Sequence, residues 1–540
     1  MASPTDMTPD ALVRTAQLHE QQGRLAEAIA AYHELLTRWP DRPASWYNLG
    51  VLLRKARQFQ PALACYQQAI ARGITQPEEV YLNRGVIFSD YLHQYDAAEQ
   101  ELNCALAVNP AYVPALINLA NLQEDLGRRA AALATYEKIL RIEPRNAQVL
   151  ARYAGATVFT KADDPLIGRL QQELANTKAS AADRASLGFA LGRALDSVGA
   201  YDPAFEAYAS ANRFSRASVP PGVSRYDRKA WEQFIDRIIG AFPAPTGAVG
   251  SGAAVGSGAA VGSGAAVGSG AAVGSGAAAG SGAEAGSGAA VGSGAAVGSG
   301  RFATATARGQ QVVFICGMFR SGSTLIERLL AADPRFTSAG ELDVLPHLVG
   351  QQLAGFPESV ASRSAAQLAQ LADDYHRSLA QAFPNATWIT DKRPDNFLYI
   401  GLIKQLFPGA RIVHTTRDPL DNCLSIFFLH LDPALSYALD LSDIGHHYRQ
   451  YARLMRHWKA LYGADIIDIN YDTYVHDTET EARKLFSGLG LDWPGHTHSQ
   501  GGAVKTASVW QVREPIYQRS SGRAQHYASR LSALSRELGS

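Results

Sequence analysis

One octet, residues 317–324, constrains the second half of this chain more than any other feature. It reads Gly-Met-Phe-Arg-Ser-Gly-Ser-Thr, which has the spacing G-x-x-x-x-G-x-[ST] of a phosphate-binding loop, with Ser323 where nucleotide hydrolases place lysine. The apolar stretch 312–316 precedes it, and a helix-like pattern runs from Thr324 to Pro334. We therefore predict a strand–loop–helix unit in which backbone N–H groups and the helix N-terminus surround an anion.

Two arginines near predicted strand ends add charge to this loop. Arg320 lies inside the octet and offers a fork of donors to an oxyanion. A second apolar stretch, 410–416, is followed directly by Arg417, and Ser425 comes eight residues later, on a helix predicted to start near Leu420. An arginine at a strand end and a serine two turns into the next helix can hold a second phosphate.

The second half of the chain alternates strand-like and helix-like segments. The predicted strands are 312–316, 386–390, 411–415 and 465–469. Such alternation favours an α/β domain with a parallel sheet, helices on both faces, and ligands at the carboxyl ends of the strands.

The two phosphate motifs, in this order and at this separation, resemble those of sulfotransferases that use 3′-phosphoadenosine 5′-phosphosulfate (PAPS). The similarity covers roughly residues 310–530, is nearest to the tyrosylprotein sulfotransferases, and implies a sulfotransferase domain over 308–535 with PAPS as co-substrate. The resemblance implies these donor-binding residues: Arg320, Ser321, Gly322, Ser323, Thr324, Arg417, Ser425, Tyr471 and Arg523.

The same resemblance implies three catalytic residues. Glu341, in a Gly-Glu pair, matches the base that accepts the acceptor's proton, and carboxylate assistance suits a tyrosine hydroxyl with a pKa near 10. Lys392 matches the lysine that stabilises the leaving group, and its neighbour Arg393 competes for that role. Ser508 matches a late serine near the sulfate.

Some positions depart from the family pattern. Phe319 replaces a proline usual in the loop, and Asp343 and His347 stand where members that modify acidic peptides carry arginines. Protein tyrosine is the acceptor favoured by the resemblance, but the preference for acidic peptides is not supported at these positions.

The first half of the chain is repetitive, with a unit of 34 residues counted from Ala28 to Ala62. Small residues, a tyrosine and a closing proline recur at fixed spacing, and one copy carries one extra residue. The pattern resembles tetratricopeptide repeats (TPRs), which are stacked helix pairs. We expect repeats over 9–146, and a helical region with a further TPR-like repeat over 147–240, with a protein or peptide as partner.

A low-complexity segment, 247–300, separates the halves. Gly-Ser-Gly-Ala-Ala-Val recurs with period six, and valine every sixth residue builds no core. We therefore expect a flexible linker; a silk-like β stack is the alternative. The predicted architecture is an all-α TPR solenoid, this linker, and an α/β P-loop-type parallel-sheet domain, with the two folded parts separable.

Composition narrows the partners and the cellular compartment expected for this protein. Lys plus Arg and Asp plus Glu both number 50, so no net field points to nucleic acid or to an anionic membrane. The four cysteines are scattered, residues 1–17 lack a signal-peptide pattern, and no run spans a bilayer, so we expect a cytoplasmic protein. His446-His447 lacks metal-ligand spacing, and no metal is expected.

The sequence leaves other acceptors and other functions open. The acceptor is alternatively a carbohydrate, a lipid-linked group or a small phenol. A P-loop kinase is disfavoured by the missing lysine, and a TPR scaffold with an inactive transferase fold is the third possibility. The identity of the TPR ligand and the oligomeric state are undecided by these patterns.

Overall fold

The computed structural model describes residues 7–219, 222, 225–243, 310–495, 518 and 520–539. The predicted linker, 247–300, lies outside these residues. The helices before it are α1 (Pro9–Gln21), α2 (Leu25–Arg38), α3 (Pro43–Lys55), α4 (Phe59–Ala71), α5 (Pro77–Val86), α6 (Tyr95–Val108), α7 (Val113–Asp125), α8 (Arg129–Ile142), α9 (Ala147–Ala156), α10 (Pro165–Leu174), α11 (Ala181–Ser197), α12 (Tyr201–Ala217) and α13 (Arg228–Ala241).

The α/β part follows the linker. Its strands are β1 (Gln311–Gly317), β2 (Phe336–Ser338), β3 (Trp388–Lys392), β4 (Arg411–Thr416) and β5 (Ile466–Asn470). Its α-helices are α14 (Ser323–Ala331), α15 (Val344–Gln352), α16 (Ala365–Ala382), α17 (Ile400–Leu406), α18 (Pro419–Phe427), α19 (Leu441–Tyr462), α20 (Tyr471–His476), α21 (Thr478–Gly488) and α22 (Ser532–Leu538). Within the described ranges, no helix is both long enough and apolar enough to cross a bilayer.

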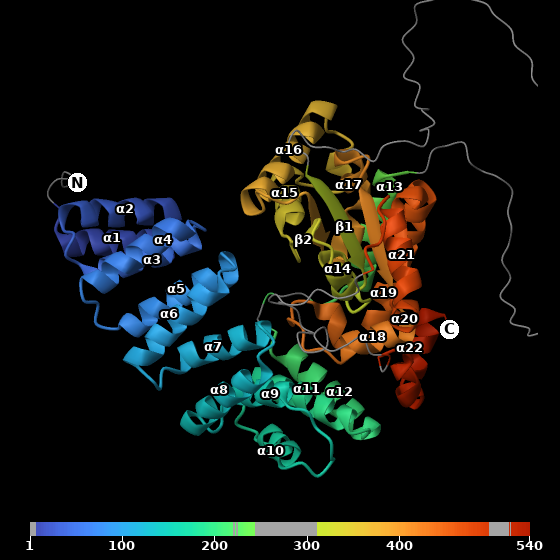
Figure 1. Ribbon diagram of the computed structural model, residues 1–540, viewed down its shortest axis with the longest axis horizontal. Helices are drawn as coiled ribbons and strands as arrows, with labels where there is room; N and C mark the ends of the chain where they lie inside the picture. The colour runs from blue at the N-terminus through green and yellow to red at the C-terminus, as the bar shows by residue number, and fades with distance from the viewer. Residues whose placement is uncertain are drawn as a thin grey trace, which may run out of the picture. The chain divides into compact units, whose positions relative to one another are not determined.

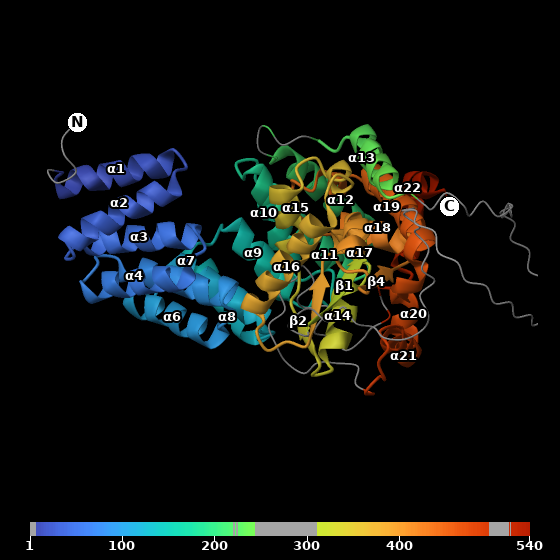
Figure 2. The same ribbon diagram turned by 90° about the horizontal axis from the view of Figure 1, so that it is seen from above.

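Helices α1–α8 form successive antiparallel pairs, as the repeat predicts (Figures 1 and 2). Glycine lets the two helices of a pair approach closely. A Cβ atom on Gly50 would lie 2.6 Å from the ring of Tyr66. The same arrangement recurs in the later pair α11–α12, where a Cβ on Gly192 would lie 2.8 Å from the ring of Tyr208. The pairs α3–α4 and α11–α12 therefore share the same glycine–tyrosine contact, and a further repeat over 187–216 stays a prediction.

The extra residue of the third repeat is accommodated by a π turn. Helix α5 continues into a π-helical segment, Ile87–Tyr91, where the Leu92 N–H donates to the carbonyl of Ile87 at 3.1 Å. Widening one turn by a residue lets the remaining small residues keep their places at the helix crossing. Ala98 and Leu102 of α6 accordingly stay buried.

The sheet has the order β2-β3-β1-β4-β5, and all its strand pairs are parallel. The four predicted strands are present; β3 starts two residues later than predicted and ends at Lys392. The three-residue edge strand β2 was not predicted. The central strand is β1, with β3 and β2 on one side of it and β4 and β5 on the other. The connections that leave β1 and β4 therefore run towards opposite edges of the sheet. Ligand sites form between connections that diverge in this way.

Both faces of the sheet are covered, because successive side chains of a strand point to opposite faces. Val313 and Ile315 of β1 belong to a buried cluster that also contains residues of α14 and α21. Phe314 and Cys316 belong to the opposite cluster, in which Phe314 lies 5.9 Å from the ring of Tyr375 in α16. This confirms the predicted parallel sheet between two helical layers.

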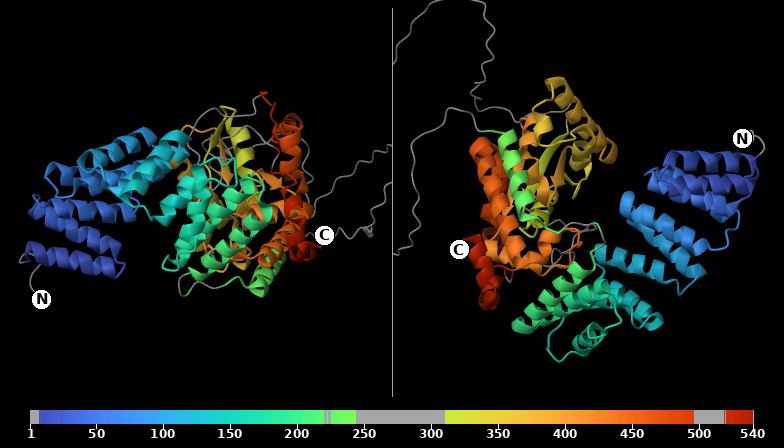
Figure 3. Two further views of the ribbon diagram at one scale, coloured as in Figure 1. Left: turned by 90° about the horizontal axis from the view of Figure 1, so that it is seen from below. Right: turned by 180° about the vertical axis from the view of Figure 1, so that it is seen from behind.

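Helix α13, which precedes the linker, packs on the α/β part rather than on the repeats alone. Figure 3 shows it beside α19, and the ring of Phe242 meets Trp458 of α19 edge-on at 5.6 Å. Arg228 Nε donates to Asp443 Oδ1 at 2.8 Å. Trp458 is fully buried, so the first half of the chain completes the core of the second half.

The helix pair α11–α12 makes a second such contact. Tyr208 stacks on Phe428 with centroids 3.9 Å apart, and Asn212 Nδ2 donates to the Phe427 carbonyl at 2.8 Å. The expectation of two separable parts therefore differs from the structure for α11–α13. The two parts were expected to be separable because of the composition of residues 247–300, and that composition gives no sign of a core shared by residues on either side of it.

Candidate functional site

The loop between β1 and α14 has the backbone that a phosphate loop requires. Gly322 has φ +98°, and Arg320 is a non-glycine residue with φ +69°, both in the left-handed region. A Cβ on Gly317 would lie 2.4 Å from the Thr415 carbonyl oxygen. Ser321 Oγ lies 2.7 Å from Thr415 Oγ1, which holds the loop against β4. Ser323 and Thr324 open α14, at the positive end of its dipole.

The two predicted phosphate motifs meet. Arg320 Nε donates to Ser425 Oγ at 3.0 Å, and Arg417 Nη1 donates to the Arg320 carbonyl at 3.3 Å. Asn422 Nδ2 of α18 adds a bond to the Phe319 carbonyl at 2.9 Å. The sheet explains this meeting, since β1 and β4 are parallel neighbours and both loops leave at their carboxyl ends. Residues about a hundred positions apart thus form one site.

Tyr471, the first residue of α20, closes the loop on a third side. A Cβ on Gly322 would lie 2.8 Å from Tyr471 Cδ2, so glycine is required for this approach. The Arg417 guanidinium lies over the Tyr471 ring at 4.9 Å. The ring therefore supports both the loop and the arginine.

Arg417 retains an unused donor. Its Nη2 also donates to the Ser520 carbonyl. Its Nε, however, is buried and has no hydrogen-bond partner among the described residues. A buried, unsatisfied donor on a cation costs free energy unless an acceptor completes it, and an anion such as a phosphate is a fitting acceptor.

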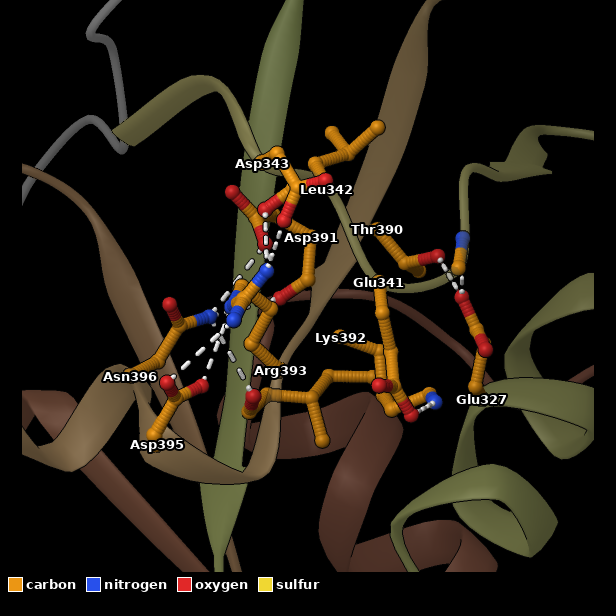
Figure 4. Close-up of polar contacts among 12 residues, drawn as sticks. Glu327, Glu341, Leu342, Asp343, Thr390, Asp391, Lys392, Arg393, Asp395 and Asn396 are labelled. Carbon is orange, nitrogen blue, oxygen red and sulfur yellow. Dashed lines mark hydrogen bonds and ion pairs between the residues drawn. The ribbon is translucent and has the colours of Figure 1, made fainter. Parts of the chain in front are cut away.

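Lys392 and Glu341 form an ion pair beside the loop (Figure 4). Lys392 Nζ donates to Glu341 Oε1 at 2.6 Å, and the side chains are 3% and 48% exposed, respectively. Lys392 ends β3 and is buried, whereas Glu341 reaches it from the segment between β2 and α15. The pair places a cation and a carboxylate at the same sheet edge as the phosphate loop.

A buried carboxylate that the sequence analysis missed fixes the Glu341 segment. Glu327 Oε1 accepts from the Gly340 N–H at 3.0 Å and from Thr390 Oγ1 at 2.7 Å, and the Lys392 N–H donates to the Gly340 carbonyl at 3.0 Å. Gly340 has φ +66°. Glu327 thereby ties α14, β3 and the Glu341 segment together. A glutamate between apolar helix positions gave no signal of this role.

Arg393, the predicted competitor of Lys392, points elsewhere. It donates to Asp395 Oδ1 at 3.0 Å, to Asp343 Oδ1 at 2.5 Å and to the Leu342 carbonyl at 3.3 Å (Figure 4). Burial lowers the pKa of Arg393, but the hydrogen bonds and charges of Asp395 and Asp343 outweigh it and raise the pKa. Arg393 is thus engaged by carboxylates on its own side of the strand.

Arg523, a predicted donor-binding residue, makes its ion pair with the first half of the chain. Arg523 Nη2 forms an ion pair with Asp196 Oδ2 of α11 at 2.6 Å. Ser508 lies outside the described residues. The two adjacent histidines are core residues: His446 bonds Glu232 at 2.9 Å, and His447 stacks on Tyr437 with centroids 3.9 Å apart.

Comparisons with known proteins identify the two parts of the chain. Residues 312–495 match the sulfotransferase family, and residues 13–77 and 113–146 match tetratricopeptide repeats. An uncharacterized protein of Aquifex aeolicus is 30% identical over 238 residues, which cover 41% of this chain. This chain spans only 31% of that relative's length.

Two solved structures are also similar to part of this chain. PilF of Pseudomonas aeruginosa is 20% identical with a TM-score of 0.30 and covers 38% of this chain and 90% of its own. PilW, a type IV pilus biogenesis factor, is 18% identical with a TM-score of 0.29 and covers 39% of this chain and 94% of its own. The family matches, rather than these structures, show a sulfotransferase-family domain and tetratricopeptide repeats within this chain.

Proposed function

We propose that this chain is a PAPS-dependent sulfotransferase that transfers a sulfuryl group to an acceptor hydroxyl, with protein tyrosine as the favoured acceptor. The TPR arm binds a protein substrate or partner. The observation that carries the proposal is the contact between Arg320 Nε and Ser425 Oγ. It unites two phosphate-binding motifs in a domain that matches the sulfotransferase family.

The donor is held at two ends. The loop Arg320–Thr324 and the start of α14 offer backbone N–H groups and positive potential to the 5′-phosphosulfate. Arg417 and Ser425 bind the 3′-phosphate, and the unpaired Nε of Arg417 supports this assignment. Tyr471 flanks the nucleotide through its position over Arg417 and Gly322.

The ion pair supplies the chemistry of transfer. A bond forms between the acceptor oxygen and sulfur, the bond from sulfur to the phosphate oxygen breaks, and the acceptor's proton passes to the Glu341 carboxylate. Lys392 stabilises the charge on the leaving oxygen. An ammonium group has three N–H donors, so Lys392 can contact Glu341 and the leaving oxygen together. Ser508 donates to the sulfate in this scheme.

The acceptor side is open and mixed in charge. Glu341 is half-exposed, and Asp343 beside it is 80% exposed. These carboxylates do not favour a strongly acidic peptide, so a tyrosine in a neutral or basic context is proposed. A carbohydrate or small phenolic hydroxyl is the alternative acceptor, and a scaffold with an inactive nucleotide-binding domain is the alternative to an enzyme.

A transfer assay tests the proposal. The full chain is incubated with PAPS labelled in the sulfate and with a lysate, and labelled products are identified by mass spectrometry. Sulfated tyrosine in a protein supports the full proposal, and label in a sugar or small phenol moves the acceptor to the alternative. Tight binding of adenosine 3′,5′-bisphosphate with no label transferred to any acceptor would contradict an enzymatic role. Glu341→Gln is the background control.

A further inference from the structure

A short segment near the C-terminus, residues 520–524, lies against the second phosphate motif. The Ser520 carbonyl accepts from Arg417. The N–H groups of Gly522 and Ala524 each donate to a different oxygen of Asp421, in α18, at 2.6 Å. The backbone of this segment is therefore fixed by the same loop and helix that carry Arg417 and Ser425.

The side chains of the segment are held from the other direction, by the first half of the chain. Arg523 opens a 3₁₀ helix, Arg523–Arg530. Its Nη2 lies 2.6 Å from Asp196 Oδ2 of α11, and the Tyr527 hydroxyl donates to the other oxygen of Asp196. The side chains of Arg523 and Asp196 are 22% and 17% exposed, so water screens this pair little.

Helix α11 does not itself favour an aspartate at this position. Asp196 is the penultimate residue of the helix, where the negative end of the helix dipole repels a carboxylate. The cation and hydroxyl across from it compensate for that repulsion. Asp196 is thus better explained by its contacts with Arg523 and Tyr527 than by the stability of α11.

Aromatic packing places these groups rigidly. The Arg523 guanidinium lies 5.0 Å from the centroid of the Phe428 ring, and Phe428 stacks on Tyr208 of α12. Burial opposes the charge on Arg523, but its interactions with Tyr208 and with the Asp196 carboxylate outweigh burial and raise the pKa of Arg523. Arg523 therefore stays a cation with a fixed direction.

We propose that Asp196 is a positioning residue of the donor site: by holding Arg523 and Tyr527 it fixes residues 520–524 against Arg417, so that the helical half of the chain completes the 3′-phosphate site. This inference rests on the proposed function, because it takes Arg417 to bind that phosphate. It adds a residue from the repeat-containing half to a site otherwise built from the α/β part.

A second ion pair across the same interface provides a matched control. Arg530 Nε lies 3.1 Å from Asp202 Oδ1 of α12, and the Asp202 side chain is 74% exposed. Asp202 also joins the two halves, but Arg530 lies at the far end of the 3₁₀ helix from residues 520–524. Loss of Asp202 removes a surface contact between the halves without touching the donor site.

The test compares two ligands on the full chain by titration calorimetry: adenosine 3′,5′-bisphosphate and adenosine 5′-monophosphate, which lacks the 3′-phosphate. Asp196→Asn should weaken the bisphosphate roughly tenfold and the monophosphate little, because it weakens the charge-assisted bond to Arg523 that holds residues 520–524 against Arg417. The ratio of the affinity for the bisphosphate to the affinity for the monophosphate therefore falls. Asp202→Asn should leave both affinities and their ratio unchanged. A milder second variant, Tyr527→Phe, keeps the ring and should lower the ratio about threefold.

Failure of this inference and failure of the proposed function give different results. A wild-type chain without preference for the bisphosphate would overturn the assignment of Arg417, and the inference with it. A wild-type preference that persists unchanged in both Asp196→Asn and Tyr527→Phe would overturn the inference alone. A ratio that rises in Asp196→Asn would also overturn it, because Asp196 would then compete with the phosphate for Arg523.

Discussion

Lys392 Nζ lies 2.6 Å from Glu341 Oε1, so the buried cation at the end of β3 and the half-exposed carboxylate before α15 form one unit. The two groups are proposed to act on opposite ends of the reaction, the lysine on the leaving oxygen and the glutamate on the acceptor hydroxyl. Their contact means that a change to either alters the surroundings of the other. Variants therefore have to be compared on both binding and turnover.

Glu341→Gln should lower turnover by about 10²–10⁴ while sparing donor binding, because the swap keeps the size of the side chain and removes only the basic carboxylate. Turnover is measured with labelled PAPS, and donor binding by calorimetry. Asp343→Asn is the matched control: Asp343 is two residues away, contacts Arg393 and is exposed, so turnover should stay near the wild-type value. Full activity of Glu341→Gln would remove the proposed base.

Lys392→Ala should also lower turnover, for a different reason: it removes the charge that stabilises the leaving oxygen. A donor analogue with a better leaving group needs that charge less. Changing from PAPS to this analogue should therefore increase the turnover of Lys392→Ala by a larger factor than it increases the turnover of wild type. Glu341→Gln should show no such extra gain. Equal gains in the two variants would contradict the separate roles.

Arg320→Ala and Arg417→Ala should each weaken adenosine 3′,5′-bisphosphate binding roughly ten- to hundredfold, since each loses charge-assisted hydrogen bonds to a phosphate. Only Arg417 is assigned to the 3′ side. Removing the 3′-phosphate from the ligand should therefore weaken binding to wild type and to Arg320→Ala, but hardly change binding to Arg417→Ala. If wild type and Arg417→Ala were equally sensitive to that phosphate, the assignment of Arg417 would be wrong.

Local patterns predicted the parts of the site that are continuous in sequence. The octet 317–324 and the pair Arg417 and Ser425 each follow an apolar strand, and parallel pairing of β1 and β4 brings them together. Glu327 was missed because its two partners, Gly340 and Thr390, lie on other elements, 13 and 63 residues along the chain. No local pattern encodes such a contact.

The shared core was missed for the same physical reason. Tyr208 of α12 occupies a conventional repeat position, where a tyrosine packs against the glycine of its own helix pair. The same ring also stacks on Phe428, more than two hundred residues later. One side chain serves two packing partners, and the repeat pattern reveals only the first.

Deleting residues 1–300 should prevent stable folding of the α/β part, because it removes α11–α13 and uncovers Trp458 and Phe428. Deleting only residues 1–76 removes α1–α4, whose buried residues form, with Val80 and Ile87, a cluster separate from the one that contains Trp458, and should preserve binding of adenosine 3′,5′-bisphosphate. Thermal melting and calorimetry of both truncated chains check this. A chain of residues 301–540 that melts cooperatively and binds the nucleotide like wild type would show that α11–α13 are dispensable.

We expect His447 to make the contact between α13 and α19 sensitive to acid. Its ring lies between Tyr437, with centroids 3.9 Å apart, and Trp231 of α13, at 4.6 Å. Burial, assisted by the neighbouring His446, lowers the pKa of His447 to about 3. Its Nδ1 is buried without a hydrogen-bond partner in the described part of the chain. The neutral ring packs well there, and the protonated ring does not.

His447→Phe should therefore reduce the loss of stability in acid. The pKa of His447 in the folded chain lies below its unfolded value of about 6.5, so the unfolded chain binds the extra proton. The contribution of the neutral His447 ring to stability is therefore complete above pH 6.5 and is lost as the pH falls towards 3. Between pH 7.5 and pH 5.0 the wild-type free energy of unfolding should fall more than that of His447→Phe, by up to about 2 kcal/mol, or about 1.4 kcal/mol for each of the 1.5 units below 6.5. Urea denaturation at both pH values measures the difference, and His476→Gln, at an exposed histidine ending α20, is the control that should behave as wild type. Parallel losses in wild type and His447→Phe would mean that His447 does not titrate in this interface.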